Sequence, residues 1–155
     1  METDISERYK KIQDRFNLPL LADLKNAFTF EIEDSNKLID QIRVEISERV
    51  FALSEKVIEP IIGSADTFSN LFEQDMFDEN EREKLFRLYK KVQALKWENN
   101  LLAIRPNDKL TAQWIRKTWD FWNNELSREL AEVCRKMAVN WQDMKFKNEN
   151  TVYHG

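Results

Sequence analysis

Apolar side chains recur every three or four residues along most of the chain, which is the spacing of one face of an α-helix. The pattern predicts a first helix over about 4–16 and a shorter one after Pro19. Three long helices are expected over about 35–62, 79–104 and 108–145. The expected fold class is therefore all-α, an elongated helical bundle of about four to six helices in which the three long helices pack as antiparallel hairpins.

Residues that favour helix ends set the boundaries of the first long helix. Asp34 and Ser35 supply side-chain oxygens that can cap its start. Gly63 is expected to close its last turn in the left-handed conformation, which glycine adopts without steric cost. Ser64 is then expected to cap a short helix.

Similar signals bound the other two long helices. Asp78 and Glu81 form a capping-box-like start for the second, because each side chain can accept a hydrogen bond from an exposed backbone amide. Pro106 ends that helix. Asn107 and Asp108 are expected to cap the last helix.

The first long helix carries one apolar stripe, which is expected to face the core. Its members are Ile39, Ile42, Ile46, Val50, Leu53, Val57 and Ile61. Residues 29–33 alternate apolar and polar side chains, but the chain offers no second strand candidate to pair with them. That segment is therefore expected to be irregular or extended.

The helix over 79–104 carries two apolar stripes. The first alternates by three and four, as in a coiled-coil seam, and consists of Leu85, Leu88, Val92, Leu95, Asn99 and Leu102. Asn99 is its polar exception, which can specify register by pairing with another polar group. The favoured interpretation is that this seam lines the core of the monomer.

The second stripe lies on the opposite flank and contains Phe86, Ala94, Trp97 and Leu101. Lys90 falls within it, while Arg87 and Arg105 border it. An ordinary surface helix would be polar there, so something is expected to cover the stripe. The cover is either a neighbouring helix of the same chain, which is favoured, or another subunit or ligand.

The start of the last helix is rich in aromatic residues that spread over about half of its circumference. They are Leu110, Trp114, Ile115, Trp119, Phe121 and Trp122. Tryptophan is enriched at interfaces, and an aromatic core is the equally weighted alternative. The candidate interface drawn from both helices is Phe86, Lys90, Trp97, Leu101, Arg105, Trp114, Trp119 and Trp122.

The net charge of −4 conceals a local imbalance. Residues 64–83 carry seven acids and one base, whereas residues 84–117 carry nine bases and two acids. Basic and aromatic residues together can bind single-stranded nucleic acid, so a nucleic-acid-binding accessory protein using 84–122 is the first alternative function. The acidic segment can instead compensate the basic one across the fold.

Catalytic and metal sites are not expected. The E-x-x-E pairs Glu45/Glu48 and Glu129/Glu132 point away from the core stripes or to their flanks, and the only histidine is His154. Two glycines cannot build a phosphate-cradling loop. A second alternative, an Mg²⁺-dependent all-α nucleotide pyrophosphohydrolase, needs only clustered acids on helices, but its E-E-x-x-E type of motif is absent.

We expect a single helical domain over 1–146 followed by a flexible tail over 147–155. Cys134 is the only cysteine, and no apolar signal stretch or run of about 18 apolar residues occurs, so a cytoplasmic location without membrane association is expected. The expected function is a non-catalytic helical interaction or scaffolding module that binds no cofactor. Its expected partner is a second copy, as a homodimer, or another protein.

Overall fold

A computed structural model describes residues 2–29, 32 and 37–144 of the chain. Its helices are α1 (Glu2–Phe16), α2 (Leu21–Phe28), α3 (Leu38–Ile62), α4 (Phe68–Asp75), α5 (Glu79–Ile104), α6 (Asp108–Phe121), the π-helical segment η1 (Trp122–Leu126) and α7 (Ser127–Asp143). None of these described residues lies in a strand. Within the same residues, no helix combines the length and apolar character needed to cross a bilayer.

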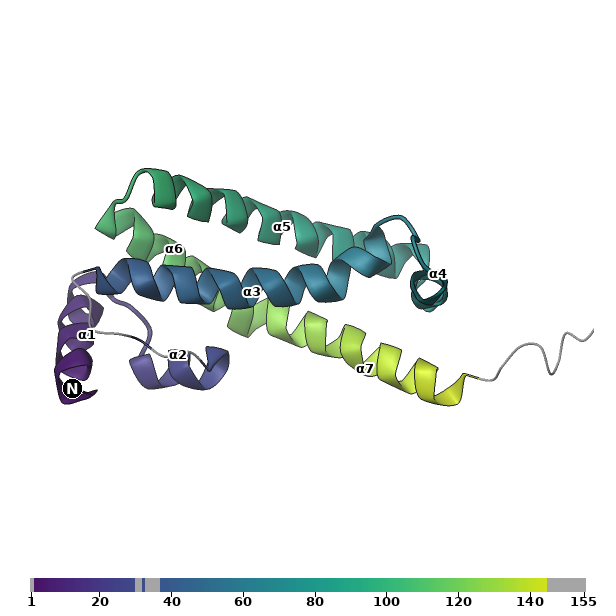
Figure 1. Cartoon of the computed structure of the whole chain (residues 1–155), viewed down its shortest axis with the longest axis horizontal. Helices are drawn as coiled ribbons and strands as arrows, with labels where there is room; N and C mark the ends of the chain where they lie inside the picture. The colour runs from purple at the N-terminus through teal and green to yellow at the C-terminus, as the bar shows by residue number, and fades with distance from the viewer. Residues whose placement is uncertain (1, 30–31, 33–36, 145–155) are drawn as a thin grey trace, which may run out of the picture.

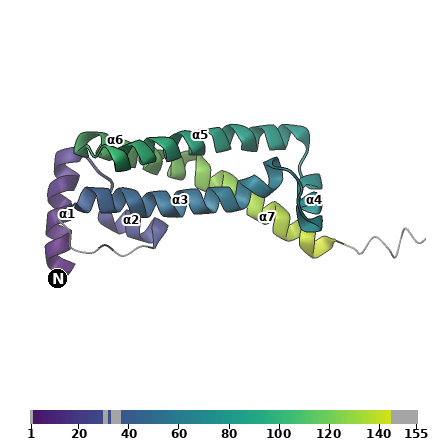
Figure 2. The same cartoon turned by 45° about the horizontal axis from the view of Figure 1, so that its top comes forward.

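Three long rods form an elongated bundle (Figure 1). They are α3, α5 and the continuous run α6–η1–α7, and α5 runs antiparallel to the other two. Helix α1 crosses one end of the bundle and α4 lies at the other end, while α2 lies beside α3 (Figures 1 and 2). The predicted elongated all-α bundle with three long helices is confirmed.

The seam of α5 lies inside this bundle. Its five apolar members, Leu85, Leu88, Val92, Leu95 and Leu102, are all buried. They pack with buried residues of the neighbouring helices, such as Ile46 and Val50 of α3 and Ile115 of α6. The seam therefore lines the core of the monomer, as favoured from the sequence.

The polar exception in the seam, Asn99, pairs with Arg43 of α3. Arg43 is only 5% exposed, and its guanidinium donates a hydrogen bond to the side-chain oxygen of Asn99 and another to its backbone carbonyl. Burial lowers the pKa of Arg43, and the negative charge of Asp40 opposes that shift. Because a buried cation needs acceptors, this contact favours one register between α3 and α5.

Two of the predicted caps are confirmed. Asp78 and Glu81 form the reciprocal capping box, with the Glu81 amide donating to Asp78 at 2.8 Å and the Asp78 amide donating to Glu81 at 3.2 Å. The Asn107 side chain accepts from the Leu110 amide at 2.9 Å. The predicted caps Asp34 and Ser35 lie outside the described residues.

The predictions for Gly63 and Ser64 were wrong. Gly63 has φ −82° and ψ −174°, an extended and not a left-handed conformation. Glycine is required there for space, because a Cβ atom would lie 2.9 Å from the carbonyl oxygen of Glu59. The short helix starts later than expected, and Thr67 caps it by accepting from the Asn70 amide at 3.1 Å.

Leu53 was wrongly assigned to the core and is 45% exposed. Ile46, Val50, Ser54 and Ile58 are buried at steps of four, and each such step advances the core-facing line by about 40° around the helix, away from Leu53. The buried positions on this part of α3 are consequently Phe51, Ser54 and Ile58.

The last long helix contains an irregularity that the sequence pattern did not indicate. At η1 the Ser127 amide donates to the carbonyl of Trp122, five residues earlier. This wider turn offsets the rotation that an unbroken α-helix would accumulate. Thr118 before it and Leu126 after it are therefore both fully buried.

Two predicted segments are covered only in part. Thr29, which has φ 46°, and Ile32 lie in neither a helix nor a strand, and the other residues of 29–33 lie outside the described residues. The predicted tail over 147–155 and the predicted domain end at 146 also lie outside them.

We predict that Asn99→Leu lowers the free energy of unfolding by about 3 kcal/mol, because it removes the side-chain acceptor of a buried cation. Asn99→Asp should retain most of the stability, since a carboxylate accepts the same hydrogen bond. Urea denaturation of the two variants measures both effects. Equal stability of Asn99→Leu and the original chain would show that the Arg43 contact does not stabilise the fold.

Candidate interaction surface

The outward face of α5 exposes large apolar side chains. Trp97 is 70% exposed, Leu101 58% and Ile104 76%, and they follow one another at intervals of four and three residues. Phe86, further toward the start of the helix, is 50% exposed. No other described helix covers this side of α5 (Figures 1 and 2). We call the outward stripe, made of Phe86, Lys90, Ala94, Trp97, Leu101 and Ile104, the α5 stripe.

The position of the α5 stripe follows from the packing of the seam. Leu95 and Leu102 point into the core, and the residues about half a turn away on the same helix must point outward. Lys90 and Ala94 are exposed along this line, and the Lys90 ammonium lies 6.0 Å from the ring centre of Phe86. An intrachain cover for this flank was favoured from the sequence pattern, and the described part of the chain does not provide one.

A groove between α5 and α6 adjoins the stripe. Its volume is about 310 Å³, and its lining residues are Glu98, Leu101, Leu102, Leu110, Gln113, Trp114 and Lys117. Trp114 lies at its base, 2% exposed, with its indole nitrogen donating to the Leu95 carbonyl at 3.0 Å. Leu110 is 51% exposed at the start of α6. Leu101 belongs both to the α5 stripe and to the groove, so the two form one continuous apolar surface.

Three of the candidate interface residues pack against other parts of the chain. Trp114 is a core residue, as its burial and its hydrogen bond show. Trp119 and Trp122 are partly buried against Phe28 of α2, with ring centroids 5.8 and 5.3 Å away. They contribute to the aromatic core that was the alternative interpretation. Lys90 and Arg105 are exposed on α5, as are Phe86, Trp97 and Leu101.

Ile104 is a surface residue of α5 that was not among the candidate interface residues. The signal was present, since Trp97, Leu101 and Ile104 continue the spacing of one helix face up to the last residue of α5. Leu110 was noticed only as part of an aromatic arc. Its proximity to Leu101 depends on the hairpin between α5 and α6, which spacing alone does not give.

Most lysines of the basic segment have partners within the chain. Lys91 lies 3.0 Å from Glu125, Lys84 3.2 Å from Glu129 and Lys117 2.5 Å from Glu98, and Lys96 pairs with Glu55. These partners come from α3, α5, η1 and α7. The acidic segment 64–83 has contacts elsewhere, because its Glu81 pairs with Lys136 at 2.6 Å. The charge of the basic segment is thus compensated across the fold, but by carboxylates outside the acidic segment 64–83 that was expected to do so.

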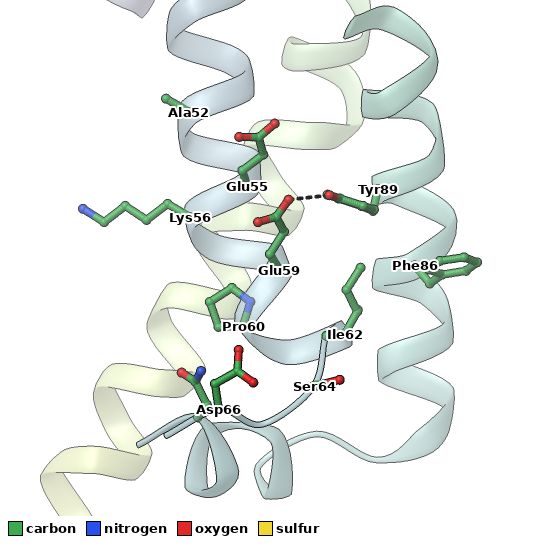
Figure 3. Close-up of a pocket in the computed structure, with 12 residues that line it drawn as sticks. Ala52, Glu55, Lys56, Glu59, Pro60, Ile62, Ser64, Asp66, Phe86 and Tyr89 are labelled. Atoms are coloured by element: carbon green, nitrogen blue, oxygen red, sulfur yellow. Dashed lines mark hydrogen bonds between the residues drawn. The ribbon is translucent and has the colours of Figure 1, made fainter. Parts of the chain in front are cut away.

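A second pocket lies near the end of α3 (Figure 3). Its volume is about 770 Å³, and its lining includes Glu55, Glu59, Asp66, Phe86 and Tyr89. The Tyr89 hydroxyl donates to the Glu59 carboxylate, and this hydrogen bond, more than burial, raises the pKa of Tyr89 to about 12. The Phe86 ring points away from the Glu59 side of the pocket.

This pocket does not assemble a recognisable reactive site. Glu59 is bonded to Tyr89, and Glu55 is paired with Lys96. Within the described residues, no three His, Cys, Asp or Glu side chains gather closely enough to hold a metal ion. Of the acidic pairs considered above, Glu129 contacts Lys84 and Glu132 contacts Arg135, while His154 lies outside the described residues.

Comparisons with known proteins add no relative to this picture. The chain matches no protein-family model, no curated protein and no solved structure.

Proposed function

We propose that this chain is a non-catalytic helical interaction module that self-associates through the α5 stripe. The observation that carries the proposal is the exposure of Trp97, Leu101 and Ile104 in one line on a helix whose other side packs in the core. Exposed apolar side chains scattered singly need no explanation, whereas a continuous apolar surface marks a binding site. Here the surface extends from Trp97 through Leu101 to Leu110.

The physical basis is the free energy of burying these side chains. A large apolar side chain gains about 1.5–3 kcal/mol when it moves from water into an apolar contact. Trp97 offers the largest area, and a rigid helix loses little conformational entropy when it binds. Trp97 and Leu101 are therefore the proposed anchors of the interface.

The nucleic-acid alternative receives less support from the arrangement of charges. Phosphate binding needs free cations, and Lys84, Lys91, Lys96 and Lys117 each contact a carboxylate. Nucleic acid would also leave the apolar line from Trp97 to Ile104 without a matching partner. A cytoplasmic location is part of the proposal and is supported by the single Cys134, which allows no disulfide within the chain.

We predict a dimer by sedimentation at micromolar concentration, and a loss of affinity of about 30-fold or more for Trp97→Ala, since buried aromatic anchors dominate interface energies. The free energy of unfolding of the Trp97→Ala monomer should change by less than about 0.5 kcal/mol, because Trp97 packs little within the chain. Trp114→Ala should instead destabilise the fold by about 3–5 kcal/mol.

Trp141→Ala is the matched control for association. Trp141 is 40% exposed on α7, away from the α5 stripe, so the same substitution there should leave the dimer intact. A monomer mass for the original chain would refute the proposal. Tight oligonucleotide binding that weakens steeply with salt and is lost in Arg105→Ala would favour the nucleic-acid alternative instead.

Metal removal provides a separate check on the absence of catalysis. We predict that a chelator changes the melting temperature by less than about 1 °C, because folding then depends on no bound ion. A decrease of several degrees that added Mg²⁺ reverses would contradict this expectation. It would direct attention to the acidic pocket beside Tyr89 and to the pyrophosphohydrolase alternative.

A further inference from the structure

Charged residues flank the α5 stripe in a particular order. At 100° per residue, Glu83, Arg87, Glu98 and Arg105 fall with the stripe within an arc of about 120°. Glu83 precedes Phe86 at one end, and Arg105 follows Ile104 at the other. Ala94, the smallest side chain of the stripe, lies midway between Glu83 and Arg105. The stripe therefore carries Glu83 and then Arg87 at one end, Glu98 and then Arg105 at the other, and its smallest side chain in the middle.

Such an order is complementary to its own reverse. When two copies of α5 lie antiparallel with their Ala94 residues facing each other, Phe86 of one copy lies opposite Leu101 of the second. Lys90 then faces the ring of Trp97, a favourable cation–π arrangement. Glu83 meets Arg105. Glu98, which contacts Lys117 of its own chain at 2.5 Å, is level with Lys90 of the second copy and three residues from the level of Arg87. A parallel alignment would instead place each of these charges beside its own copy.

We infer that the protein forms an antiparallel homodimer in which α5 packs against α5 of a second copy, with the two-fold axis at Ala94. This inference rests on the proposed function and adds the identity, direction and register of the partner. Within the described residues, Glu83, Arg87 and Arg105 make no ion pair in the single chain. They are therefore available for a partner.

The small side chain of Ala94 allows the two helices to approach closely. Helix axes pack about 8–10 Å apart, and the shorter distances require small residues at the point of closest contact. Ala94 is exposed and is followed by Trp97 and Leu101 toward one end, with Lys90 and Phe86 toward the other. Larger side chains thus flank the two-fold axis on both sides and can cover the contact between the two Ala94 residues.

Cysteine cross-linking tests the register directly. In the full chain carrying Cys134→Ser, Ala94→Cys should form a disulfide-linked dimer under mild oxidation, because facing residues at the axis satisfy disulfide geometry. Leu101→Cys in the same background should not, since the two Leu101 positions would lie roughly 20 Å apart. The original exposed cysteine is removed so that it cannot cross-link by itself.

A charge exchange tests the rim contacts without cysteine. Glu83→Arg or Arg105→Glu alone should raise the dissociation constant about tenfold, because each places like charges together twice in a symmetric dimer. The double variant Glu83→Arg/Arg105→Glu should return to within about threefold of the original affinity. The double variant also shows that the charges act on each other and not on the fold.

The outcomes separate the inference from the proposed function. A dimer that cross-links at Leu101→Cys but not at Ala94→Cys would overturn the antiparallel register and leave self-association standing. A dimer in which the double charge exchange fails to restore affinity would overturn the Glu83–Arg105 contact and with it the inferred register. A chain that stays monomeric in sedimentation would refute the proposed function itself.

Discussion

The hydrogen bonds between Arg43 of α3 and Asn99 of α5 constrain the rest of the structure. Arg43 is 5% exposed and must keep these acceptors, because a buried cation without them costs several kcal/mol. The contact thereby opposes sliding or rotation of α5 against α3. The surrounding apolar contacts alone would oppose this motion less, because aliphatic side chains can pack in more than one register. Once this register is fixed, the outward side of α5 is fixed with it.

The α5 stripe is a consequence of that choice. Trp97 lies two residues before Asn99, and two residues on an α-helix correspond to more than half a turn, so an Asn99 that faces Arg43 of α3 directs Trp97 outward. The same helix thus stabilises the bundle with one side and offers an apolar surface with the other. The surface is rigid because Leu95 and Leu102, on either side of Asn99, are held in the core.

The two nearby tryptophans show how the same residue type takes different roles. Trp114 is at the base of the groove, where burial is possible because its indole N–H finds the Leu95 carbonyl. Trp97 is on the far side of α5 from that carbonyl and remains 70% exposed. In the acidic pocket beside Tyr89, by contrast, the carboxylates of Glu55 and Glu59 already bind partners within the chain.

The sequence by itself determined the helical class, the three long helices, the capping box at Asp78 and the inward seam of α5, because periodicity and capping are local properties of the chain. It also indicated that a second stripe existed on α5. Only the tertiary structure decided that this stripe is uncovered while Trp114 is buried, because exposure depends on which helices lie next to one another. The sequence pattern also did not predict the π-helical turn at η1. Its wider turn places both Thr118 and Leu126 in the core, a requirement that arises only from the packing of the bundle.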